Sequence, residues 1–167
     1  ADVPWLTEAP AADSQVVFAP GTDAIQALAN AVGNSRVNEL YVASPFFDAK
    51  LSAFDRLIRK LRPRKTLLLV QEESVSIPGD QLARYKNVEA YNIDCDEYLH
   101  AKAVVAECGN KSILLAGSHN VSAPAFDGVN FEASLIRSSE VQFSKLLKLT
   151  DYVIDKKRIS LDAQRLR

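Results

Sequence analysis

The sequence predicts one α/β domain in which a mixed β-sheet is sandwiched between helices. Two observations lead to this prediction. Short apolar runs such as TLLLV and SILLAG have the length of buried strands, and they alternate along the chain with segments of helical 3–4 periodicity. The 167 residues, of which 47% are hydrophobic, suffice for one sizeable core. Such alternation favours a sheet covered by helices on both faces.

The first half of the chain alternates strands and helices. We expect strands at 15–19, 37–45 and 66–70, and helices at 22–34 and 48–61. The first helix starts with Asp23 and Gln26 at capping-box spacing and stops at Gly33. The second helix carries an apolar stripe from Leu51 to Leu61, which is typical of a side that faces a core.

The second half is expected to be richer in strands. We expect a short helix at 79–87, strands at 88–93, 99–107, 111–117 and 130–136, and a long closing helix at 138–157. The strands at 99–107 and 111–117 flank the letters CGN, which indicates a hairpin. Ser139 and Gln142 form a second capping box at the start of the closing helix.

The two ends of the chain differ in composition from its middle. Residues 1–14 are rich in Ala and Pro and lack periodicity, so we expect an arm or linker there, a domain at 15–155 and a polar tail at 156–167. The chain begins at Ala1 and contains no Met, which indicates either a mature form without its leader or a domain of a longer protein. The compartment stays open, with the cytoplasm favoured over a periplasmic or secreted form.

Composition excludes several classes of function. A formal charge of −1 gives no overall attraction to polyanions, so a nucleic-acid partner would have to bind local patches. No apolar run approaches the roughly 20 residues that cross a bilayer. Cys95 and Cys108 lack the spacing of a zinc site or a disulfide framework, so we expect free thiols, with a single bridge as the alternative. No cofactor or metal is expected.

Both histidines of the chain lie in one stretch, YLHAKAVVAECGNKSILLAGSHN, from Tyr98 to Asn120. Side chains at i and i+2 of a strand share a face, so His100 and Lys102 project together. After the hairpin, the next strand ends at Gly117, which brings Ser118 and Asn120 back towards His100.

A third strand adds a carboxylate to this group. Asn130 and Glu132 lie on a common face at its start. A neutral imidazole can attack phosphorus, while lysine and asparagine stabilise the charge on the non-bridging oxygens. A carboxylate bonded to the far nitrogen of a histidine fixes its tautomer. The set therefore suits phosphoryl transfer, although a histidine at a strand start is most often only a satisfied polar residue. For Glu132 the role of carboxylate partner is favoured over that of a surface strand residue, and Asn130 has support of a turn as its alternative.

Several other residues have competing interpretations. His119 occupies the position between Ser118 and Asn120 and is expected at the rim of the site, as are Ser44 and Phe46 at a strand end. Phe46 and its neighbour Phe47 could stack a base, but packing in the core is favoured. The cationic run RLIRKLRPRK, residues 56–65, is read as the solvated face of a helix, with a nucleic-acid track as the weaker alternative.

The motifs HAK, GSHN and NFE, in this order, resemble the phospholipase D superfamily, whose signature is H-x-K-x4-D followed by G-S-x-N and often N-x-E. The resemblance spans about residues 15–150 and implies a phospholipase D-like fold. It implies that His100, Lys102, Asn120 and Glu132 are catalytic, and that Ser118 helps Lys102 and Asn120 to hold the phosphate.

The chain departs from the signature at its acidic position. Glu107 stands where the motif has Asp, and the segment from there to Gly117 is longer than usual. By strand parity Glu107 faces away from His100, so we expect it to be structural.

The resemblance also implies an assembly. In that family two motifs meet at a twofold or pseudo-twofold axis, one histidine forms a phosphohistidine, the other protonates the leaving oxygen, and no metal takes part. This chain has one motif, which implies a homodimer with His100 of each subunit at the interface, or else half of a two-motif protein. Because one histidine must be neutral and the other protonated, we expect a bell-shaped pH profile.

The implied activity is that of a metal-independent phosphodiesterase resembling bacterial phospholipase D-like nucleases. A nuclease is favoured over a lipid hydrolase because the sequence has no amphipathic membrane-binding helix and no apolar loop for acyl chains. The expected partner is nucleic acid, with DNA favoured over RNA. The alternatives are an inactive binding or dimerisation module, suggested by Glu107 and the altered spacing, and a phospholipase or phosphatidyltransferase.

Overall fold

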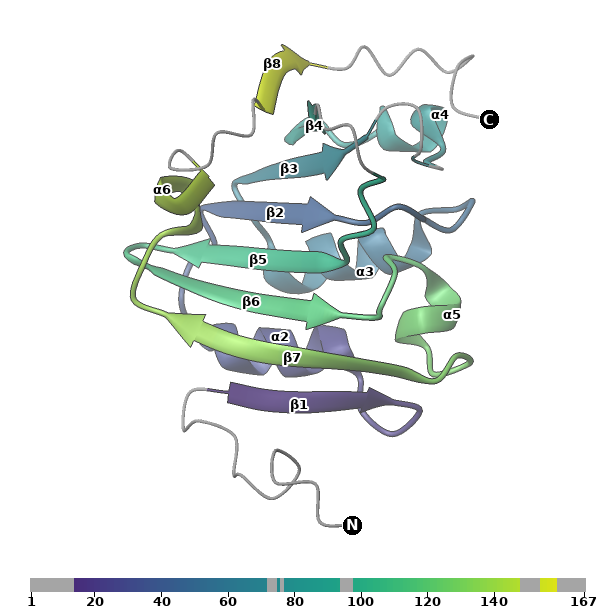
Figure 1. Cartoon of the computed structure of the whole chain (residues 1–167), viewed down its shortest axis with the longest axis vertical. Coiled ribbons are helices and arrows are strands. Elements are labelled where there is room, and N and C mark those ends of the chain that lie inside the picture. The colour runs from purple at the N-terminus through teal and green to yellow at the C-terminus, as the bar shows by residue number, and fades with distance from the viewer. Residues whose placement is uncertain (1–13, 72–74, 76, 94–97, 148–153, 159–167) are drawn as a thin grey trace.

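A mixed sheet of eight strands forms the centre of the computed structural model, which describes residues 14–71, 75, 77–93, 98–147 and 154–158. The strands are β1 (Ser14–Ala19), β2 (Glu39–Ala43), β3 (Lys65–Val70), β4 (Val88–Ile93), β5 (Ala103–Cys108), β6 (Lys111–Gly117), β7 (Glu132–Ser139) and β8 (Ile154–Arg158). Their order across the sheet is β1-β7-β6-β5-β2-β3-β4-β8 (Figure 1). The pairs β2–β3 and β3–β4 are parallel, and all other neighbours are antiparallel.

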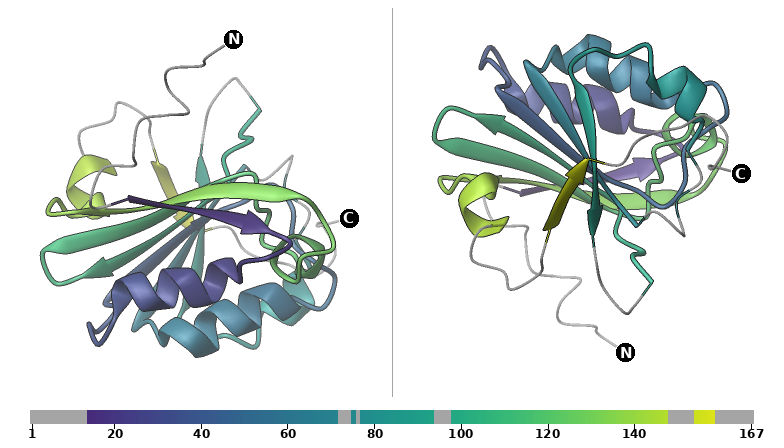
Figure 2. Two further views of the ribbon diagram at one scale, coloured as in Figure 1. Left: turned by 90° about the horizontal axis from the view of Figure 1, so that it is seen from below. Right: turned by 90° about the horizontal axis from the view of Figure 1, so that it is seen from above.

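Helices pack on both faces of this sheet. They are α2 (Ala24–Val32), α3 (Ser52–Leu61), α4 (Gly79–Leu82), α5 (Ala123–Phe126) and α6 (Phe143–Leu147). The two longer helices, α2 and α3, lie side by side on one face, and α6 lies on the other (Figure 2). The predicted class, a mixed sheet sandwiched between helices, is confirmed. No helix in the described part of the chain has the length and apolar character needed to span a membrane.

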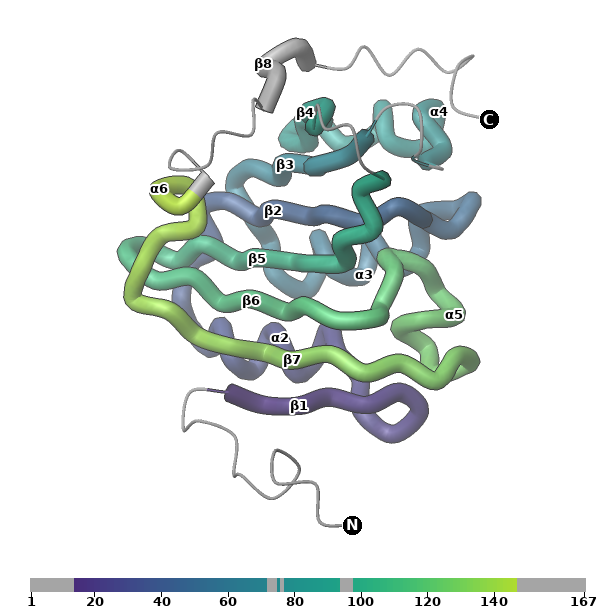
Figure 3. Tube along the Cα trace, in the orientation of Figure 1, coloured from purple at the N-terminus to yellow at the C-terminus, as the bar shows by residue number. Residues whose placement is uncertain are grey.

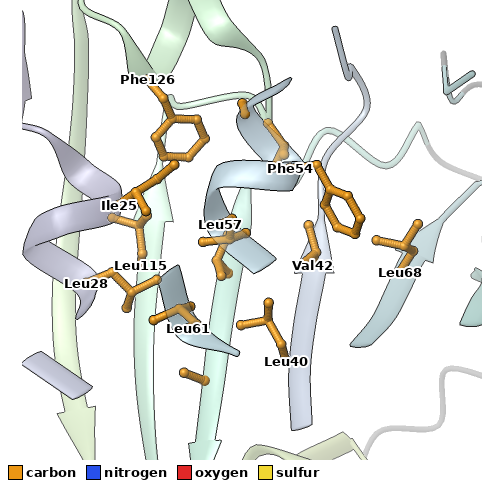
Figure 4. Packing of buried hydrophobic residues seen from close by; sticks show 14 of the residues in the cluster. Ile25, Leu28, Leu40, Val42, Phe54, Leu57, Leu61, Leu68, Leu115 and Phe126 are labelled. Atoms are coloured by element: carbon orange, nitrogen blue, oxygen red, sulfur yellow. The ribbon is translucent and has the colours of Figure 1, made fainter. Parts of the chain in front are cut away.

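The core lies between the sheet and the pair α2–α3. Figure 4 shows Leu28 of α2 and Leu57 of α3 directed towards Leu40 of β2 and Leu115 of β6. Leu28, Leu40 and Leu57 have no exposed surface. Each such side chain stabilises the fold by about 1.5–3 kcal/mol through burial. This layer holds the sheet rigid, and the candidate site is built at one end of it.

Helix α2 begins and ends where the sequence predicts. The Asp23 carboxylate accepts hydrogen bonds from the N–H groups of Ile25 (3.0 Å) and Gln26 (3.1 Å). The Gln26 side chain donates to Asn30 Oδ1 (2.6 Å) instead of returning to Asp23, so only half of the expected capping box forms. Gly33 ends the helix with φ of 62°, a left-handed conformation that glycine adopts without strain.

The predicted closing helix at 138–157 is wrong at both of its ends, 138–142 and 154–157, while residues 148–153 lie outside the described structure. Helix α6 covers only Phe143–Leu147, and Ile154–Arg158 form a strand that pairs antiparallel with β4. Without β8, β4 would be an edge strand with a row of unpaired backbone groups. This tertiary pairing overrides the local 3–4 spacing of apolar residues. β8 also crosses the expected domain boundary at residue 155, while the arm at 1–13 and the tail at 159–167 lie outside the described residues.

The start of α6 is capped by the β5–β6 hairpin and not by its own capping box. Glu107 accepts hydrogen bonds from the Ser144 N–H (3.0 Å) and hydroxyl (3.1 Å), and Ser112 Oγ accepts from the Phe143 N–H (2.8 Å). Gln142 donates to the Gly109 carbonyl (2.7 Å). Glu107 is therefore structural, and it faces away from the strand face that continues into His100, as strand parity predicts.

Smaller differences concern element lengths. α4 is shorter than the helix expected at 79–87, and α5 was not expected at all. β5 begins at Ala103, so His100 and Lys102 lie in the extended segment just before it. Cys108 is a free, buried thiol, and burial raises its pKa. Cys95 lies outside the described residues.

Candidate active site

The candidate site lies where three adjacent strands meet one edge of the sheet. β6 ends there while β5 and β7 begin, and the chain passes through α5 between β6 and β7 (Figures 1 and 3). The Gly117 N–H donates to the Lys102 carbonyl (3.2 Å), and the Ser118 N–H donates to the Ala133 carbonyl (2.9 Å). Gly117 also pairs with Ser134 in the sheet register. These contacts bring residues 100–102, 118–120 and 130–132 to one edge.

Gly117 permits an unusually close approach of β6 and β7. A Cβ atom at this position would lie 2.3 Å from the Ala133 carbonyl oxygen and 2.4 Å from Ser134 Oγ. Real Cβ contacts are never this short, so any side chain would push the strands apart. The glycine of the GSHN motif is thus a packing requirement that sets Ser118 beside Glu132, a role that the motif alone does not reveal.

His100 and Lys102 lie together and face solvent. His100 Nε2 is 2.9 Å from Lys102 Nζ, which also donates to the His100 carbonyl (3.1 Å). An ammonium group only donates, so this contact requires a lone pair on Nε2 and a proton on Nδ1. Tyr98, which is 51% exposed, lies with its ring 5.6 Å from the imidazole. Tyr98 was missed, although it stands two residues before His100 in the same segment.

The Glu132 carboxylate accepts hydrogen bonds from residues at the same end of the sheet. The Ser118 hydroxyl donates to Glu132 Oε2, and Asn130 Nδ2 donates to Glu132 Oε1 (3.2 Å). Ser118 Oγ in turn accepts the Ala133 N–H (2.9 Å). Within the described residues no hydrogen bond joins Glu132 to His100. One chain therefore gathers a carboxylate–hydroxyl–amide cluster next to a histidine–lysine pair, without linking them directly.

His119 lies beneath the site and not at its rim, so this part of the sequence prediction is wrong. The side chain is 5% exposed, and its ring centroid is 5.4 Å from that of Phe126 of α5. Nδ1 is 2.7 Å from Ser134 Oγ, while the buried Nε2 has no hydrogen-bond partner in the described structure. Burial lowers the His119 pKa, and the negative charge of Glu132 opposes this shift only in part.

Ser44 is also buried, with 3% exposure, so the prediction of a rim position fails here too. Its hydroxyl donates to the Phe46 carbonyl (2.8 Å) and accepts the Val121 N–H (3.1 Å). Ser44 thus ties the end of β2 to the segment that follows GSHN. Phe46 is 47% exposed, as a rim residue would be, whereas Phe47 is 8% exposed and packs in the core.

Asp48 has a supporting role that the sequence analysis missed. Its carboxylate accepts hydrogen bonds from the N–H groups of Ser52 (2.8 Å), Ala53 (3.1 Å) and Ala123 (3.2 Å), so it joins the start of α3 to the start of α5. Burial alone would raise the Asp48 pKa, but these hydrogen bonds and that of the Ser52 hydroxyl lower it. An acidic residue at the start of the predicted helix 48–61 was the available signal, since Asp is a favoured residue at helix starts.

Asn120 is only partly exposed, and one of its side-chain atoms lacks a hydrogen-bond partner. Its side chain is partly buried, and its Oδ1 atom is buried without a hydrogen-bond partner in the described structure. Buried acceptors are normally bonded, so an orphaned one marks a group whose partner is a ligand, water or rearranged neighbour. The Asn120 carbonyl accepts the Ser122 N–H (2.8 Å), which fixes the backbone after the motif.

Replacement of His119 by glutamine is expected to flatten the pH dependence of stability. The folded-state pKa of His119 lies below the unfolded value of about 6.5, so its contribution is complete above that pH and is lost as the pH falls below it. Wild type should therefore lose unfolding free energy as the pH falls below about 6.5, and His119→Gln should lose less. Denaturant unfolding at pH 5.5, 6.5 and 7.5 measures the free energy of unfolding of the two proteins. The same dependence on pH in wild type and variant would refute a lowered His119 pKa in the folded state.

The fold matches known structures more clearly than the sequence matches known sequences. No family model and no curated protein matches the chain. NucT from Helicobacter pylori has a TM-score of 0.55 at 17% identity, over 81% of this chain and 89% of that one. Nuc from Salmonella typhimurium, a phospholipase D family member, has a TM-score of 0.53 at 14% identity, over 81% and 87%. The described structure therefore has the phospholipase D fold that the motifs HAK, GSHN and NFE imply.

Proposed function

We propose that this protein is a metal-independent phosphodiesterase that cleaves nucleic acid, DNA in preference to RNA, through a phosphohistidine on His100. The observation that carries the proposal is the pairing of three strands that sets Lys102 against Gly117, and Gly117 against Ser134. This pairing gathers an imidazole, an ammonium, a hydroxyl, an amide and a carboxylate at one edge. Phosphodiester cleavage needs a nucleophile, a proton donor and cations or amides around the phosphoryl oxygens, and this set supplies them.

The chemistry follows from the contact between His100 and Lys102. Nε2 of His100 carries the lone pair that accepts a hydrogen bond from the Lys102 ammonium, and once this ammonium turns to a phosphoryl oxygen the lone pair is free to attack phosphorus. As the N–P bond forms, the P–O bond to the departing sugar oxygen breaks, and an imidazolium donates its proton to that oxygen. Water then gives a proton back to this second imidazole and attacks the phosphohistidine, which frees His100. Lys102, Ser118 and Asn120 hold the phosphoryl oxygens throughout.

The second imidazole is proposed to come from a second copy of the chain. His119, the other histidine, is buried against Phe126 and Ser134, so it cannot meet a leaving group. The Glu132 carboxylate makes no bond to His100 of its own chain within the described residues. We propose that it orients the imidazole of the partner subunit, whose Nδ1–H would be its donor. Each dimer would then hold two histidines and two carboxylates at one twofold axis.

Exposed apolar side chains beside the site support this assembly. Phe131 is 90% exposed and stands between Asn130 and Glu132. Val129 is 75% exposed, Phe18 is 59% exposed and Leu135 is 38% exposed. Phe18 lies on β1 and Leu135 on β7, and these two strands are paired. Clusters of exposed apolar residues next to polar groups are typical of protein interfaces.

Phe131→Asp is expected to convert a dimer into monomers and to lower activity at least about tenfold, because a charge would be buried in the proposed interface without a partner. Val141→Asp is the matched control, since Val141 is 45% exposed beyond the opposite end of β7 and should tolerate the change. Molar mass from light scattering and cleavage rates test both variants. A dimeric Phe131→Asp protein would refute this interface, and an active monomer would refute the need for a second copy.

The function itself is tested by incubating the wild-type protein with single- and double-stranded DNA and RNA in excess EDTA, beside His100→Ala. Cleavage that persists in EDTA and disappears in the variant is the expected result, and it names the preferred nucleic acid. A bell-shaped dependence of rate on pH is also expected, because one imidazole must be neutral while the other is protonated. Absence of cleavage in every wild-type sample, or equal cleavage by the variant, would overturn the proposal.

A further inference from the structure

A basic groove lies at the end of the domain opposite the candidate active site. It encloses about 560 Å³ between the last turns of α2 and α3 and the segment before β2. Arg36, Lys60 and Arg62 line it, together with the polar side chains of Asn30 and Ser35, and none of the described residues that line it is acidic. All three cations are exposed. Exposed cations thus surround a groove whose lining also includes the buried apolar side chains of Val32, Val37 and Leu61.

Other cations of the same region are neutralised by ion pairs: Arg56 with Asp23 and Asp127, Arg59 with Asp55, and Lys65 with Glu89. In contrast, Arg36, Lys60 and Arg62 form no ion pair with any residue in the described part of the chain. Within the cationic run at 56–65, Arg56, Arg59 and Lys65 are paired with carboxylates. Lys60 and Arg62 instead line the groove without a counter-charge in the described structure.

The backbone holds these three cations close together. The Arg64 N–H donates to the Val37 carbonyl (3.2 Å), so the segments that carry Arg62 and Arg36 run side by side. Arg62 itself has φ of 49°, a left-handed conformation in which glycine is the usual helix-ending residue. An arginine in this conformation is strained, because its Cβ atom crowds the following carbonyl oxygen. The residue in this strained position is one of those that line the groove.

The electrostatic balance of the groove favours an anion. The carboxyl ends of α2 and α3 contribute about half a negative charge each, and the three side chains contribute three positive charges, which leaves a net of about +2. Guanidinium groups bind phosphate oxygens in a bidentate manner. The side-chain oxygen Oδ1 of Asn30 already accepts a hydrogen bond from the Gln26 side chain, so the side-chain N–H groups of Asn30 remain as donors for a ligand.

We infer that this groove is a second anion-binding site, separate from the catalytic one, for a ligand that carries several phosphate groups. The chemistry fits either the backbone of a bound polynucleotide or a free oligophosphate. Helix α3 starts at Ser52, whose N–H donates to Asp48 near the active site, and ends at the groove, and its ten residues span about 15 Å. A polynucleotide longer than this helix can touch both sites, whereas a free oligophosphate would occupy the groove alone.

The test compares two triple variants in a His100→Ala background, which prevents turnover and makes binding independent of the proposed activity. Arg36→Gln/Lys60→Gln/Arg62→Gln removes the groove cations. Arg84→Gln/Lys86→Gln/Lys145→Gln is the control, because it removes the same charge from exposed positions elsewhere. Binding of a labelled single strand of about 20 nucleotides, long enough at about 3.4 Å each to reach both sites, is followed by anisotropy over a range of salt. Binding of sodium tripolyphosphate is measured by calorimetry.

The groove triple is expected to weaken oligonucleotide binding about tenfold at low salt and to reduce the slope of log K against log salt by about 2, which corresponds to three lost contacts at roughly 0.7 each. The control triple should change affinity less than about threefold. Loss of tripolyphosphate binding alone would assign the groove to a free oligophosphate and would support the inference. Equal binding of both probes by the two triples, with both proteins folded by circular dichroism, would overturn it.

Discussion

His100→Ala is expected to lower the rate of phosphodiester cleavage by about four orders of magnitude, equivalent to roughly 5.5 kcal/mol of transition-state stabilisation. The effect is this large because the proposed dimer takes both its nucleophile and its proton donor from position 100, one from each subunit. A typical acid or base contributes about 10² to 10⁴ on its own. Single-turnover cleavage in excess EDTA measures the loss.

Stability serves as the control for that result. His100 is exposed, and the described contacts of its side chain are those with Lys102 and Tyr98. Its removal should therefore change the free energy of unfolding by no more than about 0.5 kcal/mol. A variant that stays folded and keeps more than a tenth of the wild-type rate would show that the chemistry does not pass through His100, and the proposed mechanism would have to be abandoned.

Gly117→Ala is expected to destabilise the fold by about 3 kcal/mol, at the upper end of ordinary overpacking effects. The added Cβ would meet the Ala133 carbonyl oxygen at 2.3 Å and Ser134 Oγ at 2.4 Å, and one of these is backbone that cannot swing aside. β6 and β7 would have to separate at the point where Ser118 meets Glu132, so activity should fall as well. Denaturant unfolding and cleavage rates measure the two effects.

Gly109→Ala provides the matched comparison within the same hairpin. Gly109 has φ of 61°, and a Cβ atom there would meet nothing within 4 Å. Gly109→Ala therefore tests backbone strain without a steric clash. It should lower the free energy of unfolding by only about 1 kcal/mol and leave the activity unchanged. If Gly117→Ala proved no more harmful than Gly109→Ala, the close approach of β6 and β7 would not be a constraint on the site.

The edge that carries the candidate site could be predicted because it depends on strand parity and hairpin direction. Two residues of spacing put His100 and Lys102 on one face, and a short turn returns the chain to the same end of the sheet. The same rule placed Glu107 on the opposite face, where it caps α6. These are local rules, so they hold without knowledge of the rest of the molecule.

What the sequence could not predict depends on contacts between distant segments. His119 is buried because Phe126 of the four-residue helix α5 packs against it, and a helix this short leaves no periodic signal. Ser44 is buried because its hydroxyl meets the backbone of Val121. Residues 154–158 pair with β4, a strand far away in the sequence whose backbone groups would otherwise be unpaired on that side. Their spacing with the preceding apolar residues nevertheless looks helical. Local patterns carry no information about such partners.

The burial of His119 affects how the specificity of such an enzyme can be engineered. In the G-S-x-N motif the x position looks like the free choice for a mutant library, because it is flanked by two residues proposed to hold the phosphate. Here its side chain belongs to the layer between Phe126 and Ser134. Randomising it would select for folding rather than for substrate. A library directed at Phe46 and Tyr98, whose exposed rings border the same edge, would vary the surface that a substrate meets.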